Sequence, residues 1–329
     1  LHPAMERPNL TVMPYMHVHR VLFEGTRAVG VAAAQLGQVS EFRAEREVIL
    51  CGGAYHSPQL LMLSGIGPAE HLTMREIEVL LDEPRVGENL VDHPATYGVW
   101  TTPEPVSLLL ALEPAALEEF EQSQSGPLTS NLAEGGGFVR LASGDGPPDV
   151  QFHIAPVQIV DEGQSDPTAH GLWISPCVLQ QEARGSVRLQ NGDPTGKPVI
   201  RNNFYATEQD TRLALEAWRL LEDITRRPAL AKYCAEPFTV PASGSDADAL
   251  AHIKRTTFAI YHPVGTCAMG SVVDDELRVN GVEALRVVDA SVMPMVPRGN
   301  TNAPVIAIAE RAADLIRGEV PAATESANA

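Results

Sequence analysis

The sequence predicts an α/β fold interrupted by an inserted region of α+β character. Three observations carry this prediction. An apolar run near residue 50 ends at a Gly-Gly pair, a middle region alternates strand-like runs with polar turns, and an apolar run near residue 287 leads into a terminal helix. A buried strand that ends at glycine is typical of the ligand-binding edge of an α/β sheet. The first and last parts of the chain are therefore expected to form one domain around an insert.

Residues 1–95 are expected to supply strands and one short helix. LTVMPYMHVHRVLFEG, RAVGVAAAQ and FRAEREVILCGG are rich in β-branched and apolar residues, which predicts strands between residues 10 and 50. SPQLLMLSGIG predicts a helix with Ser57 as its N-cap, Pro58 at its first position and Gly65 at its end. The polar loop RVGENLVDHP closes this part of the chain.

Residues 96–255 are expected to form the insert. Prolines break residues 101–130 into helical pieces and loops. GGFVRL, DVQFHIAPV, GLWISPCVL and GSVRLQ, separated by polar turns, predict an antiparallel sheet. An amphipathic helix is expected in TEQDTRLALEAWRLLEDITRR, whose apolar stripe is Leu213, Ala217, Leu220, Leu221 and Ile224.

Residues 256–329 return to α/β character, with a strand at LRVVDAS, a loop rich in Pro and Gly, and a helix at APVIAIAERAADLI. Asn302 directly precedes this helix and is expected to cap it, with Pro304 in the first turn. A helix N-terminus carries a positive partial charge and free N–H groups, so the same position could stabilise an anion. The two roles are compatible.

Composition excludes several classes of function. The 329 residues are 44% hydrophobic and 20% charged, which is ordinary for a globular protein. The net charge of −18 argues against nucleic acid, which requires clustered Lys and Arg. Apolar runs fall short of the roughly 20 residues that span a bilayer, so no membrane span is expected. The scattered cysteines favour a reducing, cytoplasmic location.

His262, in YHPVGTCAMG, is the leading candidate for chemistry. Pro263 holds it extended, and Gly265 permits close approach of another backbone segment. A neutral imidazole suits a general base that removes a hydroxyl proton, although a structural histidine is an equally open interpretation. His17 and His19 share a strand face without a third ligand at suitable spacing, so no metal site is predicted.

Asp289, at the end of LRVVDAS, could cap the next turn or hold a hydroxylated ligand. The serines lack the G-x-S-x-G context of a hydrolase nucleophile, and no G-x-G-x-x-G dinucleotide fingerprint is present. Elementary chemistry therefore predicts an α/β protein with one candidate base.

Five segments, in order along the chain, resemble the glucose-methanol-choline (GMC) family of FAD-dependent oxidoreductases. GGAYHSPQLLMLSGIGP resembles the second family signature, and HPVGTCAMG resembles the segment with the catalytic histidine. LRVVDASVMPMVPRGNTNAPVIAIAERAADLI resembles the C-terminal flavin segment. RVGENLVDHP and GSVRLQNGDPTGKPVI also resemble family segments, but less strongly. Within the family the chain is most similar to choline-dehydrogenase-like alcohol dehydrogenases.

The resemblance implies an incomplete FAD-binding, Rossmann-like domain from residues 1–95 and 256–329. A substrate-binding domain from residues 96–255, built on an antiparallel sheet plus helices, is then inserted. It also implies oxidation of a small-molecule alcohol to an aldehyde or ketone. Hydride passes to flavin N5, His262 acts as the base, and Asn300 assists at the second catalytic position. Oxygen or a quinone-like acceptor would reoxidise the flavin.

Further residues match family positions or line the expected pocket. The expected FAD contacts are Val18, Asp289, Ala290, Asn302, Ala303 and Pro304. Phe152 and Trp173, in the insert, are candidates for the substrate pocket.

The chain departs from the family pattern in one respect: the strand–GxGxxG–helix unit that grips the FAD pyrophosphate is absent. It therefore resembles the C-terminal part of a GMC protein, and we expect it alone to bind FAD weakly or not at all. A missing N-terminal FAD-binding half is then an expected partner. Two alternatives stay open: a catalytically silent fragment or partner subunit of a split enzyme, and hydroxynitrile-lyase-like activity on the same fold.

Overall fold

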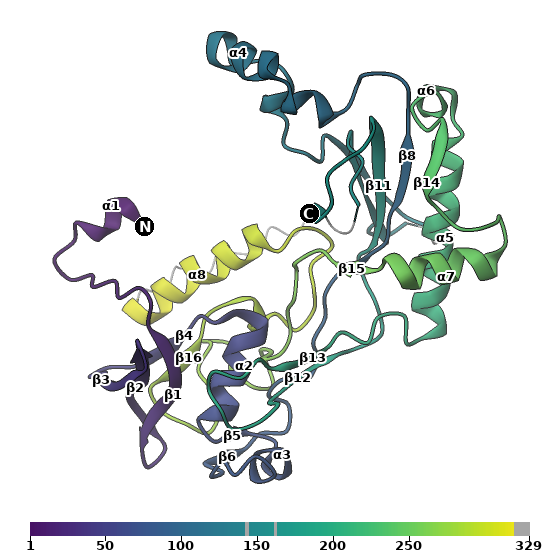
Figure 1. Cartoon of the computed structure of the whole chain (residues 1–329). Helices are drawn as coiled ribbons and strands as arrows, with labels where there is room; N and C mark the ends of the chain where they lie inside the picture. Colours follow the sequence, from purple (N-terminus) through teal and green to yellow (C-terminus); the bar gives the residue numbers. More distant parts are fainter. Residues whose placement is uncertain (142–144, 161–162, 319–329) are drawn as a thin grey trace.

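A computed structural model describes residues 1–141, 145–160 and 163–318. Its elements fall into two groups, which lie in different parts of Figure 1. We call residues 17–92, 185–201 and 262–317 lobe A, and residues 93–184 and 204–260 lobe B. Both lobes mix helices with sheets, as the sequence predicts.

The described strands are β1 (His17–Glu24), β2 (Arg27–Gln35), β3 (Gln38–Arg43), β4 (Val48–Leu50), β5 (Ile66–Gly67), β6 (Leu81–Asp82), β7 (Pro94–Ala95), β8 (Gly98–Thr101), β9 (Gly135–Val139), β10 (Val150–Ala155), β11 (Gly171–Val178), β12 (Ser186–Arg188), β13 (Val199–Arg201), β14 (Glu236–Thr239), β15 (Phe258–Ala259) and β16 (Leu285–Val287). The described helices are α1 (His2–Met5), α2 (Gly53–Leu63), α3 (Ala69–Thr73), α4 (Pro114–Ser123), α5 (Glu208–Thr225), α6 (Pro228–Ala231), α7 (Asp246–Thr256) and α8 (Asn302–Arg317), with 3-10 turns η1 (Leu108–Leu112), η2 (Pro127–Thr129) and η4 (Ala290–Val292).

The strands expected between residues 10 and 50 are present, in part as an antiparallel meander. Its order is β1-β2-β3, and the turn between β1 and β2 falls at Gly25. The first strand begins at His17, so residues 10–16 were wrongly expected to belong to it. Pro14 lacks a backbone N–H for a sheet ladder, and Tyr15 adopts a φ of 62°, which is not a strand conformation.

A parallel pair of strands joins the last part of the chain to the first part. β16 pairs in parallel with β4, with Leu285 opposite Val48 and Val287 opposite Leu50. The carboxyl ends of parallel strands meet at one edge, so the Gly-Gly after β4 lies beside Asp289 after β16. The chain between these strands includes all of lobe B, which accounts for the interrupted pattern in the sequence.

The helix after β4 begins earlier than its capping pattern predicts. α2 starts at Gly53, and Ser57 and Pro58 lie inside it rather than at its start. Proline has no N–H to donate to the carbonyl four residues before it, here Ala54. The hydroxyl of Thr266 donates to that carbonyl oxygen at 2.6 Å, which satisfies the group that Pro58 leaves free. A tertiary contact therefore permits a proline that local rules would exclude.

Lobe B contains the antiparallel sheet expected in the insert. Its main path is β14-β8-β11-β10-β9, with β7 paired to β11 and β15 paired to β7. Helices α5 and α7 pack against it through a core that includes Trp100, Phe152, Ile174, Trp218 and Ile253. The predicted strand at GSVRLQ does not join this sheet, because β12 pairs with β13 and places Leu189 in the core of lobe A.

The terminal helix is confirmed, but its expected cap is wrong. α8 begins at Asn302 itself, and Thr301 occupies the N-cap position without a side-chain capping bond. Thr301 already has helical backbone angles, with φ −84° and ψ −10°, whereas a capping side chain needs an extended backbone. In the part of the chain that the structure describes, no helix is long and apolar enough to cross a membrane.

Candidate active site

The backbone around His262 is held by contacts with residues 89–92, which end the first of the three segments of lobe A. Val91 and Val264 exchange both backbone hydrogen bonds, at 3.1 and 2.8 Å. The N–H of His262 donates to Oδ1 of Asp92 at 3.0 Å. Gly265 adopts a φ of +96°, and a Cβ there would lie 2.2 Å from the carbonyl oxygen of Asn89. The predicted close approach at Gly265 is therefore real, and it fixes where His262 can lie.

A second histidine, His93, lies directly against His262. Their Nδ1 atoms are 2.9 Å apart and their rings are nearly perpendicular, at 88°. Sequence reasoning missed His93. The sequence did contain a signal, since both histidines directly precede a proline. The two His-Pro segments run antiparallel, since β7 pairs with β15 on one side and Val91 with Val264 on the other.

Burial keeps both imidazoles neutral near pH 7. It lowers the pKa of His262 below its usual value, and the nearby charge of His153 acts in the same direction. Burial, followed by the charge of His262, lowers the pKa of His93 to about 4, against the opposing effect of the Leu179 and Pro297 carbonyls. A neutral imidazole has a free lone pair, so His262 meets the electrostatic requirement for a base.

Asp92 connects the two histidines through their backbones. Its Oδ1 accepts from the N–H of His93 at 2.7 Å as well as from that of His262. Burial raises the pKa of Asp92 to about 6, and the two N–H bonds oppose that rise. Oδ2 is buried and makes no hydrogen bond within the described residues. This oxygen is therefore available to a further donor.

Asn300 and the start of α8 belong to the same part of lobe A. A small core joins Val91 and Val264 to Val296 and to Val305 of α8. Asn300 is exposed, and its side chain makes no hydrogen bond within the described ranges. Asn302 and Ala303 are also exposed, Pro304 is partly buried, and α8 lacks a side-chain cap. The free N–H groups of this first turn can therefore receive a negatively charged group.

Asp289 performs the structural role that the sequence left open. Its Oδ1 accepts from the N–H of Ser291 at 2.8 Å, which caps the 3-10 turn η4 that begins at Ala290. Its Oδ2 accepts from the N–H of Gly53 at 3.0 Å and from the hydroxyl of Ser57 at 2.5 Å. Asp289 thereby joins the ends of β4 and β16 to the start of α2.

Val18 is the second residue of β1 in lobe A. It lines a cavity of about 290 Å³ between β1, α2 and residues 194–197, together with His56 and Gln59. His56 and Gln59 hydrogen-bond to each other at 2.9 Å, and Gln59 also donates to the carbonyl of Gly196. The cavity offers an apolar wall and a few polar groups, which is a usual arrangement for a ligand site.

Phe152 and Trp173 lie on opposite faces of the sheet in lobe B. Phe152 is 4% exposed and packs in the core beneath α5. Its side chain therefore faces the core of lobe B. Trp173 is opposite Ala155, on the face that also carries His153. It packs against Tyr97 and Phe258, with ring centroids 6.1 and 6.2 Å away.

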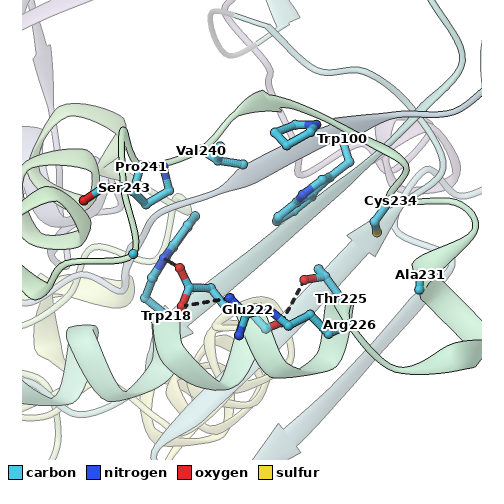
Figure 2. A pocket seen from close by; sticks show the side chains of 12 residues that line it. Trp100, Trp218, Glu222, Thr225, Arg226, Ala231, Cys234, Val240, Pro241 and Ser243 are labelled. Atoms are coloured by element: carbon cyan, nitrogen blue, oxygen red, sulfur yellow. Dashed lines mark hydrogen bonds and ion pairs between the residues drawn. The ribbon is translucent and has the colours of Figure 1, made fainter.

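A separate cavity of about 480 Å³ lies between α5 and the strands β8 and β14 (Figure 2). Trp100 from β8 and Trp218 from α5 line it, and Glu222, also from α5, contributes a carboxylate. Glu222 accepts from Nε1 of Trp218 at 3.1 Å and pairs with Arg219 at 2.8 Å. Its charge is therefore already compensated, and none of the candidate residues lines this cavity.

The described residues contain no group of three or more His, Cys, Asp or Glu placed to hold a metal ion. The start of α8 is the feature of lobe A that fits FAD. The uncapped, exposed start of α8 provides N–H groups and a positive partial charge of the kind that stabilises an anionic ring or phosphate. Asn302 and Ala303 would hold such a group there.

Comparisons with known proteins identify the family. Residues 1–95 match the N-terminal domain and residues 181–309 match the C-terminal domain of a family described as GMC oxidoreductase. The oxygen-dependent choline dehydrogenase of Paraburkholderia phymatum is 40% identical over 99% of this chain. That of Cronobacter sakazakii is 41% identical over 98% of it. The chain spans 59% of the length of each of these relatives.

Solved structures agree with this assignment. A formate oxidase from Aspergillus oryzae, studied for its FAD modification, matches 95% of this chain and 61% of its own, with a TM-score of 0.88 and 27% identity. Pyridoxine 4-oxidase from Mesorbium loti matches 98% of this chain and 61% of its own, with a TM-score of 0.85 and 28% identity. The predicted fold class and FAD as the family's cofactor are thereby confirmed. The chain belongs to the GMC oxidoreductase family.

Proposed function

We propose that this protein oxidises an alcohol to an aldehyde or ketone with FAD as its cofactor, and that His262 is the base. One observation carries the proposal. Val264, two residues after the buried, neutral His262, shares a small core with Val296, just before the loop of Asn300, and with Val305 in the uncapped first turn of α8. A proton acceptor, a hydrogen-bond donor and a positive partial charge are the groups that alcohol oxidation by hydride loss requires.

Each of these groups has a distinct task. FAD, when bound, supplies the acceptor for the hydride that leaves the carbinol carbon. The imidazole of His262 takes the hydroxyl proton, so that the carbon can lose hydride. The amide of Asn300 donates a hydrogen bond to the substrate oxygen as negative charge develops there. The start of α8 stabilises negative charge at its N–H groups.

We further propose that residues 1–95 and 256–329 contribute to the FAD domain and residues 96–255 to the substrate domain. Val18, Asp289, Ala290, Asn302, Ala303 and Pro304 are the proposed cofactor contacts, and Trp173 is the proposed pocket residue. Choline is the first substrate to test and oxygen the first acceptor, because the relatives are named oxygen-dependent choline dehydrogenases.

The test is anaerobic reduction of the flavin by choline and by a panel of primary alcohols, with FAD in excess. We expect the His262→Ala variant to reduce flavin about 10²- to 10⁴-fold more slowly. Asn300→Ala should lose about 10²- to 10³-fold, because one donor to the developing oxyanion is removed. His2→Ala, at an exposed position, is the matched control and should have no effect.

Two results would contradict the proposal. An unchanged rate of flavin reduction in His262→Ala would show that His262 is not the base. Cleavage of a cyanohydrin without reduction of the flavin would favour the lyase alternative.

A further inference from the structure

The hydrogen bond between His93 and His262 determines which nitrogen of His262 is free. The bond joins the two Nδ1 atoms at 2.9 Å. A neutral imidazole carries its hydrogen on one nitrogen and a lone pair on the other. One of the two Nδ1 atoms must therefore donate and the other must accept.

The second nitrogen of His93 identifies the donor. Nε2 of His93 lies 3.2 Å from the carbonyl oxygen of Leu179, which can only accept. Nε2 of His93 therefore carries the hydrogen, and its Nδ1 carries the lone pair, because burial keeps this imidazole neutral. The hydrogen in the bond between the rings then belongs to Nδ1 of His262. The lone pair of His262 is left on Nε2, which makes no hydrogen bond within the described residues.

The surroundings hold both rings in this arrangement. Asp92 accepts from the backbone N–H of each histidine, and Ile260 donates to the carbonyl of His93 at 3.3 Å. Leu179 is fully buried at the end of β11, so its carbonyl has a fixed position. His153 is close to both rings, and burial lowers its own pKa, which keeps it uncharged near pH 7.

We propose that His93 is a positioning residue that holds His262 in the tautomer with hydrogen on Nδ1 and the lone pair on Nε2. This inference rests on the proposed function, in which Nε2 of His262 takes the hydroxyl proton. After that transfer both nitrogens of His262 carry hydrogen, and Nδ1–H still donates to His93. His93 itself neither gains nor loses a proton, so it stabilises the imidazolium as a neutral acceptor.

The test compares two variants of nearly equal shape, His93→Asn and His93→Leu. Both lose the bond to Leu179, but only asparagine offers an oxygen near the position of Nδ1. The protein is labelled with ¹⁵N-histidine, and His262 is identified by the loss of its signals in His262→Ala. We expect hydrogen on Nδ1 of His262 in the wild-type protein and in His93→Asn, and a mixture of tautomers in His93→Leu.

Activity provides the second readout. The kcat of alcohol oxidation should fall about 10- to 100-fold in His93→Leu, with KM little changed, and should be largely restored in His93→Asn. Hydrogen on Nε2 of wild-type His262, or an unchanged tautomer in His93→Leu, would overturn the inference whatever the activity. The expected tautomers together with full activity in His262→Ala would instead overturn the proposed function and leave the positioning role intact.

Discussion

Two His-Pro dipeptides lie side by side in this molecule, and their histidines differ in how many hydrogen bonds they make. Both ring nitrogens of His93 have partners, and the side chain is 1% exposed. His262 has a partner for Nδ1 only, within the described residues, and is 7% exposed. The same dipeptide therefore yields one histidine with no unused ring nitrogen and one whose Nε2 has no partner within the described residues. The hydrogen-bond partners, not the dipeptide, separate the two roles.

The two segments are also anchored in different ways. His93 is held through its ring, by His262 and by the carbonyl of Leu179. The segment of His262 is held mainly through its backbone and near neighbours: Gly265 passes close to Asn89, and Thr266 bonds to α2. Changes to these anchors should therefore affect the two histidines to different extents.

The largest expected effect is at Gly265. Gly265→Ala places a Cβ against the carbonyl oxygen of Asn89 at a left-handed φ, and we expect the free energy of unfolding to fall by about 4 kcal/mol. Gly270→Ala is the matched control, because Gly270 also has a positive φ but no atom within 4 Å of the added Cβ. It should cost only the backbone strain, about 1 kcal/mol. Equal losses in urea unfolding would show that the approach to Asn89 does not hold this segment.

The next effect is a pH dependence of stability that originates at His93. Its pKa falls from 6.5 to about 4 on folding, so the unfolded chain binds the proton first as the pH drops. The stabilisation by neutral His93 is complete above pH 6.5 and is lost as the pH falls toward 4. Asp92 acts in the opposite direction, since its pKa rises on folding.

A comparison with His93→Asn separates the contribution of His93 to the pH dependence of stability from that of Asp92. The stability difference between the wild-type protein and His93→Asn should shrink by about 3 kcal/mol from pH 7 to pH 4, because Asp92 is present in both. Unfolding curves at a series of pH values measure this difference. A constant difference would mean that His93 is not held neutral in the folded state.

The smallest expected effect is at Thr266, which supports the segment of His262 from the side of α2. Thr266→Val removes the hydroxyl that donates to the Ala54 carbonyl, and should cost about 1–2 kcal/mol. Pro58→Ala restores an N–H that can donate to the same carbonyl, so the double variant should recover about 1 kcal/mol of that loss. Strict additivity in the double-mutant cycle would show that Thr266 does not compensate for Pro58.

The fold was largely predictable because its signals are local or periodic. The Gly-Gly end of β4, the turn at Gly25 and the apolar stripe of α5 each depend on neighbouring residues. The errors arose where a distant group satisfied the backbone. Pro58 lies inside α2 because Thr266 supplies its missing hydrogen bond, and β12 leaves the main sheet because it pairs with β13.

The candidate site was only partly predictable for the same reason. His262, Asn300 and the start of α8 lie in segments with distinctive sequence, so they could be named in advance. His93 could not be assigned a role, because its partner is 169 residues away and nothing local indicates that the two rings meet.

The sequence by itself determined the family, the succession of elements and the identity of a candidate base, since these follow from residue types and their local spacing. The tertiary structure alone decided how that base is supported. Antiparallel pairing of Val91 with Val264 brings two histidines together, and Asp92 fixes both backbones. The carbonyl of Leu179 then sets where the protons lie. Tautomers depend on which groups face each nitrogen, and only folding determines those groups.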